Sequence, residues 1–329
     1  MSPVQKLESL PQGVKSANLH IWADWVELLC LVNMDREVSV EWVLDRISER
    51  RDLGEVEEPD PVPTSSDETA ELHDRYVREV YQWFEHLAYR AGEFEAFYPF
   101  ELGEGTLRCK DGIDDDPRCR LYVFLLLASC LKYITKSCEN WLANRFEIAS
   151  LVALKSYLPT AGTLRLFGTN PLNSGSYGVM FRHRLELLAK ELGERISSRS
   201  EGENLNHSGD GGLDVVGWVP FGDKAPGSLL LFGQCACGKG WEGKEFEAHA
   251  RKWEKYISFT VPPSNVVFVP YCFRRADGRW HEQLAISDSI LIDRVRMVHL
   301  LQDKLRLLGR IHPYDELVSE VLQYVEPLV

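Results

Sequence analysis

A pair of short apolar segments joined by a glycine- and proline-containing turn constrains the fold of this chain more than any other feature. Residues 213–219 and 228–237 are rich in aliphatic and aromatic side chains, and the segment FGDKAPG lies between them. This pattern predicts a β-hairpin. Each strand contains a polar residue among its apolar ones, Asp214 in the first and Gln234 in the second. If the strands pair, these two side chains can lie near each other at one edge of a sheet.

The first half of the chain has helical periodicity. Apolar residues recur at helical spacing in residues 19–32, 38–50, 69–91, 118–135 and 139–157. An acidic, proline-rich loop covers residues 52–68. The longest apolar run, LYVFLLLASCL, has 11 residues, whereas a membrane span needs about 20. We therefore expect this run to form a buried helix, and we expect no membrane association.

The second half alternates helical and strand patterns. The hairpin is followed by a strand pattern at 265–273, and helical patterns cover 177–197, 241–257, 290–308 and 314–324. Glycine, proline, asparagine and serine crowd into residues 159–176, which we interpret as a domain boundary. The sequence thus predicts an all-helical domain over 1–164, with a partner-binding or regulatory role, and an α/β domain with a small mixed sheet over 165–329. The protein as a whole would be α+β.

Eight cysteines are scattered along the chain, and the polar N-terminal sequence has no cleavable signal. This distribution predicts free thiols in a reducing, cytoplasmic compartment. Cys235 and Cys237 form half of a zinc-ligand set, but the chain has no second pair at metal-ligand spacing. We therefore expect both to be small buried hydrophobic residues.

An acid, a second oxygen ligand and a lysine are the groups that a hard-cation site requires. Asp214 and Gln234 supply the first two, and Glu186 flanks the apolar stripe of the preceding helix, where it can point at the same edge. A carboxylate and a carbonyl oxygen can hold Mg²⁺ while water and a phosphate complete its coordination. Such a metal lowers the pKa of its bound water, and a lysine orients that water and stabilises the developing charge. This pattern predicts metal-assisted phosphodiester hydrolysis.

Residues 170–310 resemble the PD-(D/E)XK nuclease superfamily, which has the restriction-endonuclease-like fold. Glu186 matches the helix acid of that family, Asp214 in GDGGLDVVGW the hairpin aspartate, and Gln234 in LLLFGQCACG the (E/Q) position. Within the superfamily the chain looks most like restriction-like effectors of bacterial anti-phage defence. The resemblance implies a Mg²⁺- or Mn²⁺-dependent DNA endonuclease whose metal is held by Asp214, Gln234 and Glu186.

The chain departs from the family motif at its lysine. Ala236 stands where the family has lysine, and two substitutes lie nearby, Lys239 in a loop and Lys244 in the next predicted helix. We favour Lys244, which would complete a catalytic set with Glu186, Asp214 and Gln234. The departure also leaves a second reading, a degenerate nuclease fold that serves as a nucleic-acid or protein scaffold. In a third, the helical half is a sensor or adaptor.

Each candidate residue also has an ordinary structural interpretation. Asp214 can cap a turn, Gln234 can be a buried amide with satisfied hydrogen bonds, and Glu186 can be an exposed residue of an amphipathic helix. Lys239 and Lys244 can be solvated surface residues. These alternatives remain open at the level of the sequence.

The net charge of −13 is unevenly distributed. Residues 165–329 contain 20 basic and 21 acidic residues, which leaves 17 basic and 29 acidic residues for 1–164. A protein this acidic should bind naked DNA poorly, because phosphate contacts dominate DNA affinity. We therefore expect an ATP-driven translocase, another defence subunit or a homo-oligomer to deliver the DNA. No nucleotide-binding loop of the GxxxxGK[ST] type is present in the chain.

Overall fold

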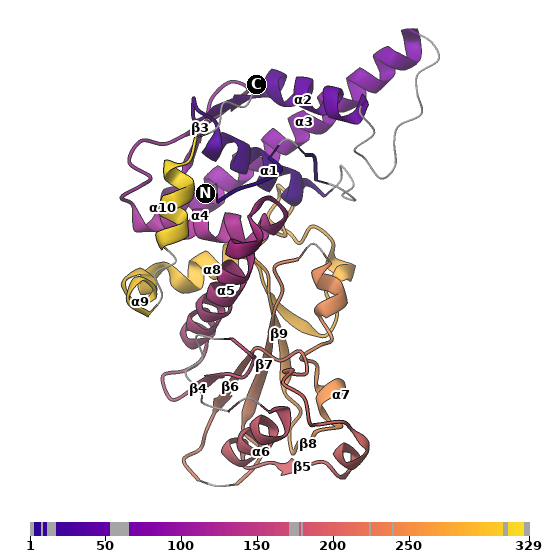
Figure 1. Ribbon diagram of the computed structural model, residues 1–329, viewed down its shortest axis with the longest axis vertical. Coiled ribbons are helices and arrows are strands. Elements are labelled where there is room, and N and C mark those ends of the chain that lie inside the picture. The colour runs from indigo at the N-terminus through magenta and orange to yellow at the C-terminus, as the bar shows by residue number, and fades with distance from the viewer. Residues whose placement is uncertain are drawn as a thin grey trace. The chain divides into compact units, whose positions relative to one another are not determined.

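The computed structural model describes residues 3–7, 9–11, 18–52, 66–170, 178, 180–223, 225–238, 240–311 and 315–325. It forms two compact units (Figure 1). The first comprises residues 1–139, 271–281 and 313–329, and the second comprises 140–270 and 282–312. This division differs from the expected boundary after residue 164, because most of the helix at 136–157 belongs to the second unit. The expected fold class, a helical N-terminal region followed by a mixed sheet, is confirmed.

The first unit is built mainly from helices. They are α1 (Leu19–Val32), α2 (Val40–Asp52), α3 (Ser66–Phe94), α4 (Pro117–Ser129), α10 (Asp315–Gln323) and the 3₁₀ turns η1 (Glu95–Phe97) and η2 (Leu131–Tyr133). The expected helices are thus present, and α1 has the expected bounds. A small antiparallel sheet of order β1-β3-β2 joins them, formed by β1 (Glu37–Ser39), β2 (Phe100–Leu102) and β3 (Thr106–Cys109). Its strands are too short for their periodicity to be recognised in the sequence.

Helix α4 confirms the expected buried helix. Asp116 caps its N-terminus by accepting a hydrogen bond from the amide of Arg118 at 2.9 Å, and Pro117 occupies the first turn, where its missing N–H is not needed. Every residue from Leu121 to Ala128 is buried. In the described parts of the chain, no helix has the length and apolar character needed to span a membrane.

Helix α1 is buried on nearly all sides and contains two acidic residues. Arg90 of α3 donates hydrogen bonds to Asp24 Oδ1 at 2.7 Å and to Glu27 Oε2 at 2.8 Å. The hydroxyls of Tyr98 and Tyr122 each donate to Glu27 Oε1 at 2.9 Å. Because all five side chains are buried, this network compensates charges that would otherwise be very costly inside the unit.

The second unit is organised around a five-stranded mixed sheet of order β10-β9-β7-β6-β4. Its strands are β4 (Thr163–Leu166), β6 (Val215–Val219), β7 (Leu229–Cys235), β9 (Ser264–Phe268) and β10 (Ser289–Ile292). The strands β4, β6 and β7 pair antiparallel, whereas β9 is parallel to both β7 and β10. The predicted hairpin is therefore the centre of this sheet.

The remaining elements of the second unit are helices and a two-stranded sheet. The helices are α5 (Lys136–Tyr157), which belongs to this unit from Asn140 onward, α6 (Phe181–Leu192), α7 (Ala250–Trp253), α8 (Arg294–Leu301) and α9 (Leu305–Ile311). The 3₁₀ turns are η3 (Ser198–Gly202), η4 (Trp241–Lys244), η5 (Gln283–Ala285) and η6 (Gln302–Lys304). The two-stranded sheet pairs β5 (Arg195–Ile196) with β8 (Ile257–Ser258).

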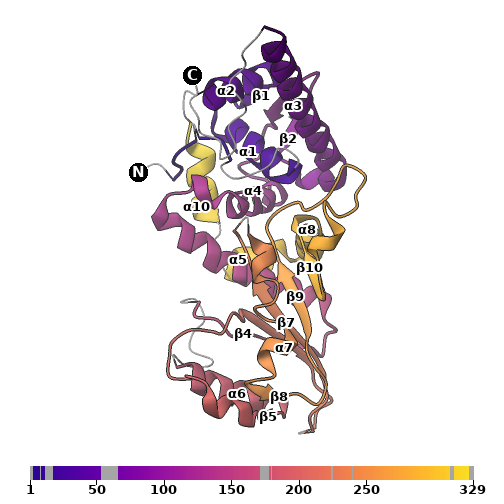
Figure 2. The ribbon, with the colours of Figure 1, turned by 90° about the vertical axis from the view of Figure 1, so that its right-hand side faces the viewer.

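Helices cover both faces of the sheet (Figure 2). Leu154 and Leu158 at the end of α5 lie against Gly217 of β6, where a Cβ on the glycine would approach Leu158 to 2.9 Å. On the other face, Trp218 and Phe232 pack with α6 residues and Trp253 of α7 in one buried cluster. Alternation along β6 and β7 separates these two sets of side chains.

Two predicted elements of the second half were wrong in type or length, and one strand was missed. The helix expected over 241–257 is two short pieces, η4 and α7. The helix expected over 290–308 starts as β10, and α8 begins after Asp293, whose side chain accepts a hydrogen bond from Arg296 N at 3.2 Å. Strand β4 was not expected at all. Its four residues, TLRL, are too few to show a periodicity that distinguishes strand from helix, and sheet pairing decides it.

Candidate functional site

Two polar residues, Asp214 and Gln234, lie at one end of the β6–β7 hairpin. Val215 pairs with Gly233, and the amide of Asp214 also donates to the carbonyl oxygen of Gly233, at 2.9 Å, so two residues of one strand face a single residue of the other, as in a β-bulge. The backbone amide of Cys235 donates a hydrogen bond to Asp214 Oδ2 at 2.7 Å. Asp214 and Gln234 are both buried, each with 7% of its surface exposed. Both residues expected from the sequence are thus buried on neighbouring strands, and the amide of Cys235 links Asp214 to the strand that carries Gln234.

A second carboxylate approaches Asp214 beside the turn that follows β4. The amides of Phe167 and Gly168 donate to the carbonyl oxygen of Asp214 at 2.8 and 3.3 Å. A Cβ on Gly168 would lie 3.3 Å from Asp214 Oδ1 and 3.6 Å from Asp210 Oδ2. The absence of a side chain at Gly168 therefore leaves room for two carboxylates close to the same backbone segment.

Helix α5 contributes a third carboxylate, Glu147. The pKa of Glu147 is raised from 4.5 to about 7, mainly by burial and to a smaller extent by the charge of Asp210, while a hydrogen bond from Asn170 Nδ2 at 2.8 Å to Glu147 Oε2 opposes the shift. Burial also raises the pKa of Asp214 well above its usual value, and Glu147 is the charged group with the largest effect on it. Three acids thus interact at one end of the sheet, and bringing them together ionised is unfavourable without a compensating cation.

Lys244 supplies a positive charge to this cluster. It is the last residue of η4, and its charge lowers the pKa values of Asp214 and Cys237 against the larger effects of burial and of nearby carboxylates. Ala236, at the position of the family lysine, is fully buried and its amide donates to the carbonyl oxygen of Phe268 at 2.9 Å. Lys239 lies outside the described residues. Of the two substitute lysines, Lys244 is therefore the one with a described electrostatic link to Asp214.

Gln234 has a buried side-chain oxygen without a hydrogen-bond partner. Its Nε2 donates to the carbonyl oxygen of Cys235 at 3.3 Å, while Oε1 is buried and has no hydrogen-bond partner. A buried amide oxygen without a partner is costly, and such an oxygen is a ligand of the kind that Mg²⁺ takes. Gln234 Oε1 and the carboxylate of Asp214 are therefore, each by its chemistry, oxygens of the kind that a hard cation takes as ligands.

Glu186 occupies a different place from the other candidates. It lies on the exposed side of α6, while Leu185, Leu188 and Ala189 form the buried side. It is not among the charged groups that shift the pKa of Asp214. The helix acid that the structure does bring to Asp214 is Glu147.

The sequence contained a signal for Glu147. In α5 this acid stands between Phe146 and the apolar segment IASLVAL, next to residues that are buried. Because the expected domain boundary lay after this helix, Glu147 was placed in the helical domain. It was therefore not considered together with the residues of the sheet. Asp210, in a glycine-rich loop, had no periodicity that could place it near the sheet.

A buried arginine supports the loop that carries Asp210. Arg184 of α6 donates to the carbonyl oxygens of Phe167 at 3.1 Å, Ser208 at 2.5 Å and Gly209 at 2.9 Å. Burial lowers its pKa, and the charge of Asp210 opposes that effect. The contacts tie α6 to both segments that hold the carboxylates.

The number of carboxylates that reach one point is limited. Among the described residues, no group of three or more histidine, cysteine, aspartate or glutamate side chains is arranged to hold a metal ion. A cation at Asp214 and Gln234 would thus need oxygen ligands from water and a bound phosphate as well. This is the usual way in which proteins bind Mg²⁺.

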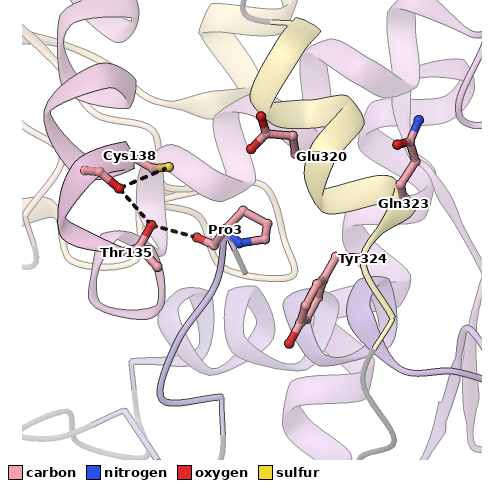
Figure 3. A pocket seen from close by; sticks show the side chains of 7 residues that line it. Pro3, Thr135, Cys138, Glu320, Gln323 and Tyr324 are labelled. Carbon is pink, nitrogen blue, oxygen red and sulfur yellow. Dashed lines mark hydrogen bonds between the residues drawn. The ribbon is translucent and has the colours of Figure 1, made fainter. Parts of the chain in front are cut away.

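A separate hollow lies in the first unit (Figure 3). It has a volume of about 600 Å³ and lies between the N-terminal end of α5 and the helix α10. Its lining includes Pro3, Thr135, Cys138, Glu320, Gln323 and Tyr324. The Thr135 hydroxyl donates to the carbonyl oxygen of Pro3 at 3.4 Å, so part of its wall is held by a local contact.

Comparison with known proteins identifies no relative of this chain. No protein-family model matches it, and neither a curated protein nor a solved structure matches it.

Proposed function

We propose that this protein is a metal-dependent phosphodiesterase, with DNA as its substrate and endonucleolytic cleavage as its reaction. The observation that carries the proposal is the buried Asp214 at the end of the hairpin, on which the charges of Glu147, Asp210 and Lys244 act, with the unpartnered Oε1 of Gln234 on the neighbouring strand. The order of elements supports it, because an acid-bearing helix, the hairpin and a lysine-bearing turn follow one another as in the PD-(D/E)XK family.

The proposed roles follow from the surroundings of each side chain. Asp214 and Gln234 would hold Mg²⁺ or Mn²⁺, which supplies an activated water and neutralises phosphate charge when bound. Glu147 replaces Glu186 as the helix acid, because its charge acts on Asp214. Lys244 would orient the attacking water and stabilise the negative charge that develops on the phosphate.

The raised pKa values support a role in cation binding. Glu147 and Asp214 both hold protons more strongly than free carboxylic acids do. A divalent cation competes with those protons, because it stabilises the ionised carboxylates. Binding would therefore convert a cluster that prefers to be partly protonated into one that is fully ionised.

Partners and setting remain proposals from charge and resemblance. With a net charge of −13, the chain should depend on a partner ATPase, another defence subunit or a homo-oligomer for DNA delivery. Bacterial anti-phage defence in the cytoplasm is the setting that the resemblance implies.

A scaffold function is the second candidate, and the buried Ala236 favours it. At the family's lysine position this side chain has no amine and no exposure. A protein that kept the fold without the reaction would bind nucleic acid or a partner protein without cleaving either.

Calorimetric titration of Mn²⁺ and Mg²⁺ at low salt, with the wild-type protein and its Asp214→Asn variant, tests the proposal. Saturable binding by the wild type that is lost in the variant, with unchanged circular dichroism, is the expected result. Asp223→Asn is the matched control, since Asp223 lies exposed in the turn at the other end of the same hairpin. Plasmid nicking with Mn²⁺ then separates the candidates, because metal binding without cleavage would favour the scaffold.

A further inference from the structure

Two buried cysteine thiols are in contact in the first unit. Cys30 of α1 and Cys109 of β3 are 79 positions apart in the chain, and their sulfur atoms lie 3.9 Å apart. Cys30 is fully buried and Cys109 is 7% exposed. Neither is in a disulfide. The contact thus joins the buried helix of the unit to the central strand of its small sheet.

Local hydrogen bonds hold both thiols in place. Cys30 Sγ lies 3.3 Å from the carbonyl oxygen of Leu107 and 3.4 Å from that of Arg36, so its one hydrogen can be donated to either carbonyl or to Cys109 Sγ. The amide of Cys109 also donates to the carbonyl oxygen of Arg36, at 2.8 Å. If the Cys30 thiol loses its hydrogen, the carbonyl oxygen of Arg36 therefore still accepts a hydrogen bond from the amide of Cys109.

The surroundings make the two sulfurs chemically different. The hydrogen bond from Cys30 lowers the pKa of Cys109, and the Arg36 guanidinium lowers it further against the effect of burial. Burial raises the pKa of Cys30, with further contributions from its hydrogen bond with Cys109 and from nearby charge. One sulfur is therefore suited to be the nucleophilic thiolate and the other to be the resolving thiol.

We propose that Cys30 and Cys109 form a redox modification site, in which hydrogen peroxide converts the contacting thiols to a disulfide between α1 and β3. The Cys109 thiolate attacks one peroxide oxygen, which gives a sulfenic acid as the O–O bond breaks and hydroxide leaves. Cys30 sulfur then attacks the Cys109 sulfur, its proton is released, and the sulfenic oxygen leaves as water. Two thiols and one peroxide thus yield one disulfide and two waters.

The bond would change the stability of the first unit. Cross-linking positions 30 and 109 restricts the unfolded chain over α2 and α3, and such long loops gain most from closure. The two sulfurs, 3.9 Å apart, would have to approach each other by almost 2 Å to reach the S–S bond length of about 2 Å. The oxidised protein should unfold at a temperature higher by about 5–15 °C than the reduced protein, and dithiothreitol should reverse the difference.

Peroxide treatment of the folded full-length protein tests the proposal. Remaining thiols are alkylated in denaturant, and bridged peptides are identified by mass spectrometry without reduction, alongside the thermal unfolding midpoint. A Cys30–Cys109 peptide and a raised midpoint are expected in the wild type, and both should be lost in Cys109→Ser. Cys138→Ser is the matched control and should retain both, because Cys138 is half-buried and lies elsewhere in the unit.

Two results would overturn the proposal. In the first, Cys30 and Cys109 both remain fully alkylatable in the wild type while Cys138 has been oxidised. In the second, the bridged peptide forms only when peroxide is added to protein already unfolded in urea. Both readouts use the wild-type chain, so they hold even if a serine variant fails to fold.

Discussion

The amide of Asp214 donates to the carbonyl oxygen of Gly233, which is also the register partner of Val215, at the end of the β6–β7 hairpin. Side chains alternate along a strand, so a shift of one residue in this register would send the side chains of one strand to the opposite face of the sheet. Close contacts fix the register, since a Cβ on Gly233 would approach Phe268 to 3.1 Å. The geometry of the candidate site is therefore set by packing at the centre of the sheet.

Substitutions of Glu147 and of Glu186 should affect metal binding differently. Glu147→Gln should weaken Mn²⁺ binding by about 10- to 100-fold, the range for residues that ligate or support a bound metal. Glu186→Gln should leave the affinity unchanged, because Glu186 is exposed and does not act on Asp214. Calorimetry of both variants beside the wild type measures the difference. A loss of affinity in Glu186→Gln alone would return the role of helix acid to α6.

The raised pKa of Glu147 predicts a dependence of folding stability on pH. In the unfolded chain the group ionises near 4.5, and in the folded protein near 7. Between these values the folded state binds more protons than the unfolded state, so the free energy of unfolding falls as pH rises from about 4.5 to 7. A shift of about 2.5 units corresponds to about 3 kcal/mol as an upper limit, because the side chain is only partly buried.

Urea unfolding of the metal-free protein between pH 4.5 and 8 measures this dependence. Glu147→Gln should flatten the decline, and the part that remains belongs to Asp214, whose pKa burial also raises. Saturating Mn²⁺ should restore stability at pH 8 in the wild type. Stability that rises across this interval in the metal-free wild type would contradict the assignment.

The sequence predicted the parts of the site that lie on one local element. Asp214 and Gln234 belong to a single hairpin, whose two strands and turn have a clear composition. Glu147 and Asp210 reach the same place only because β4 pairs with β6 and brings α5 and the loop at 207–212 alongside. That pairing depends on a four-residue strand with no distinctive periodicity. The local sequence pattern therefore could not predict that Glu147 and Asp210 lie near Asp214.

The first unit shows a similar limit. The apolar spacing of α1 predicted the helix with the correct bounds, but Asp24 and Glu27 within it gave no sign of being buried. Their partner Arg90 is 66 and 63 positions away. Pattern recognition treats charged residues as a solvated face, and only the fold identifies which of them are paired inside.

Arg90 should be among the residues that most affect the stability of the first unit. Arg90→Leu removes the guanidinium that donates to both Asp24 and Glu27, so both buried carboxylates lose this ionic partner. Such a loss costs about 3–5 kcal/mol. Arg118→Leu is the control, because its ion pair with Asp116 is exposed and its removal should hardly move the urea midpoint. Equal midpoints for the two variants would show that the buried network contributes little.

Gly212 should be the glycine near the site that least tolerates a side chain. Its φ of +79° lies in the left-handed region, and a Cβ there would lie 2.7 Å from the Cβ of Glu247. Gly212→Ala should lower the free energy of unfolding by about 1–3 kcal/mol from backbone strain, and the steric contact adds to this loss. Because the residue lies two positions before Asp214, Mn²⁺ affinity should fall as well. Gly238→Ala is the matched control, since its Cβ would meet no atom within 4 Å. A Gly212→Ala protein with the stability and Mn²⁺ affinity of Gly238→Ala would show that the loop before β6 adapts without moving Asp214.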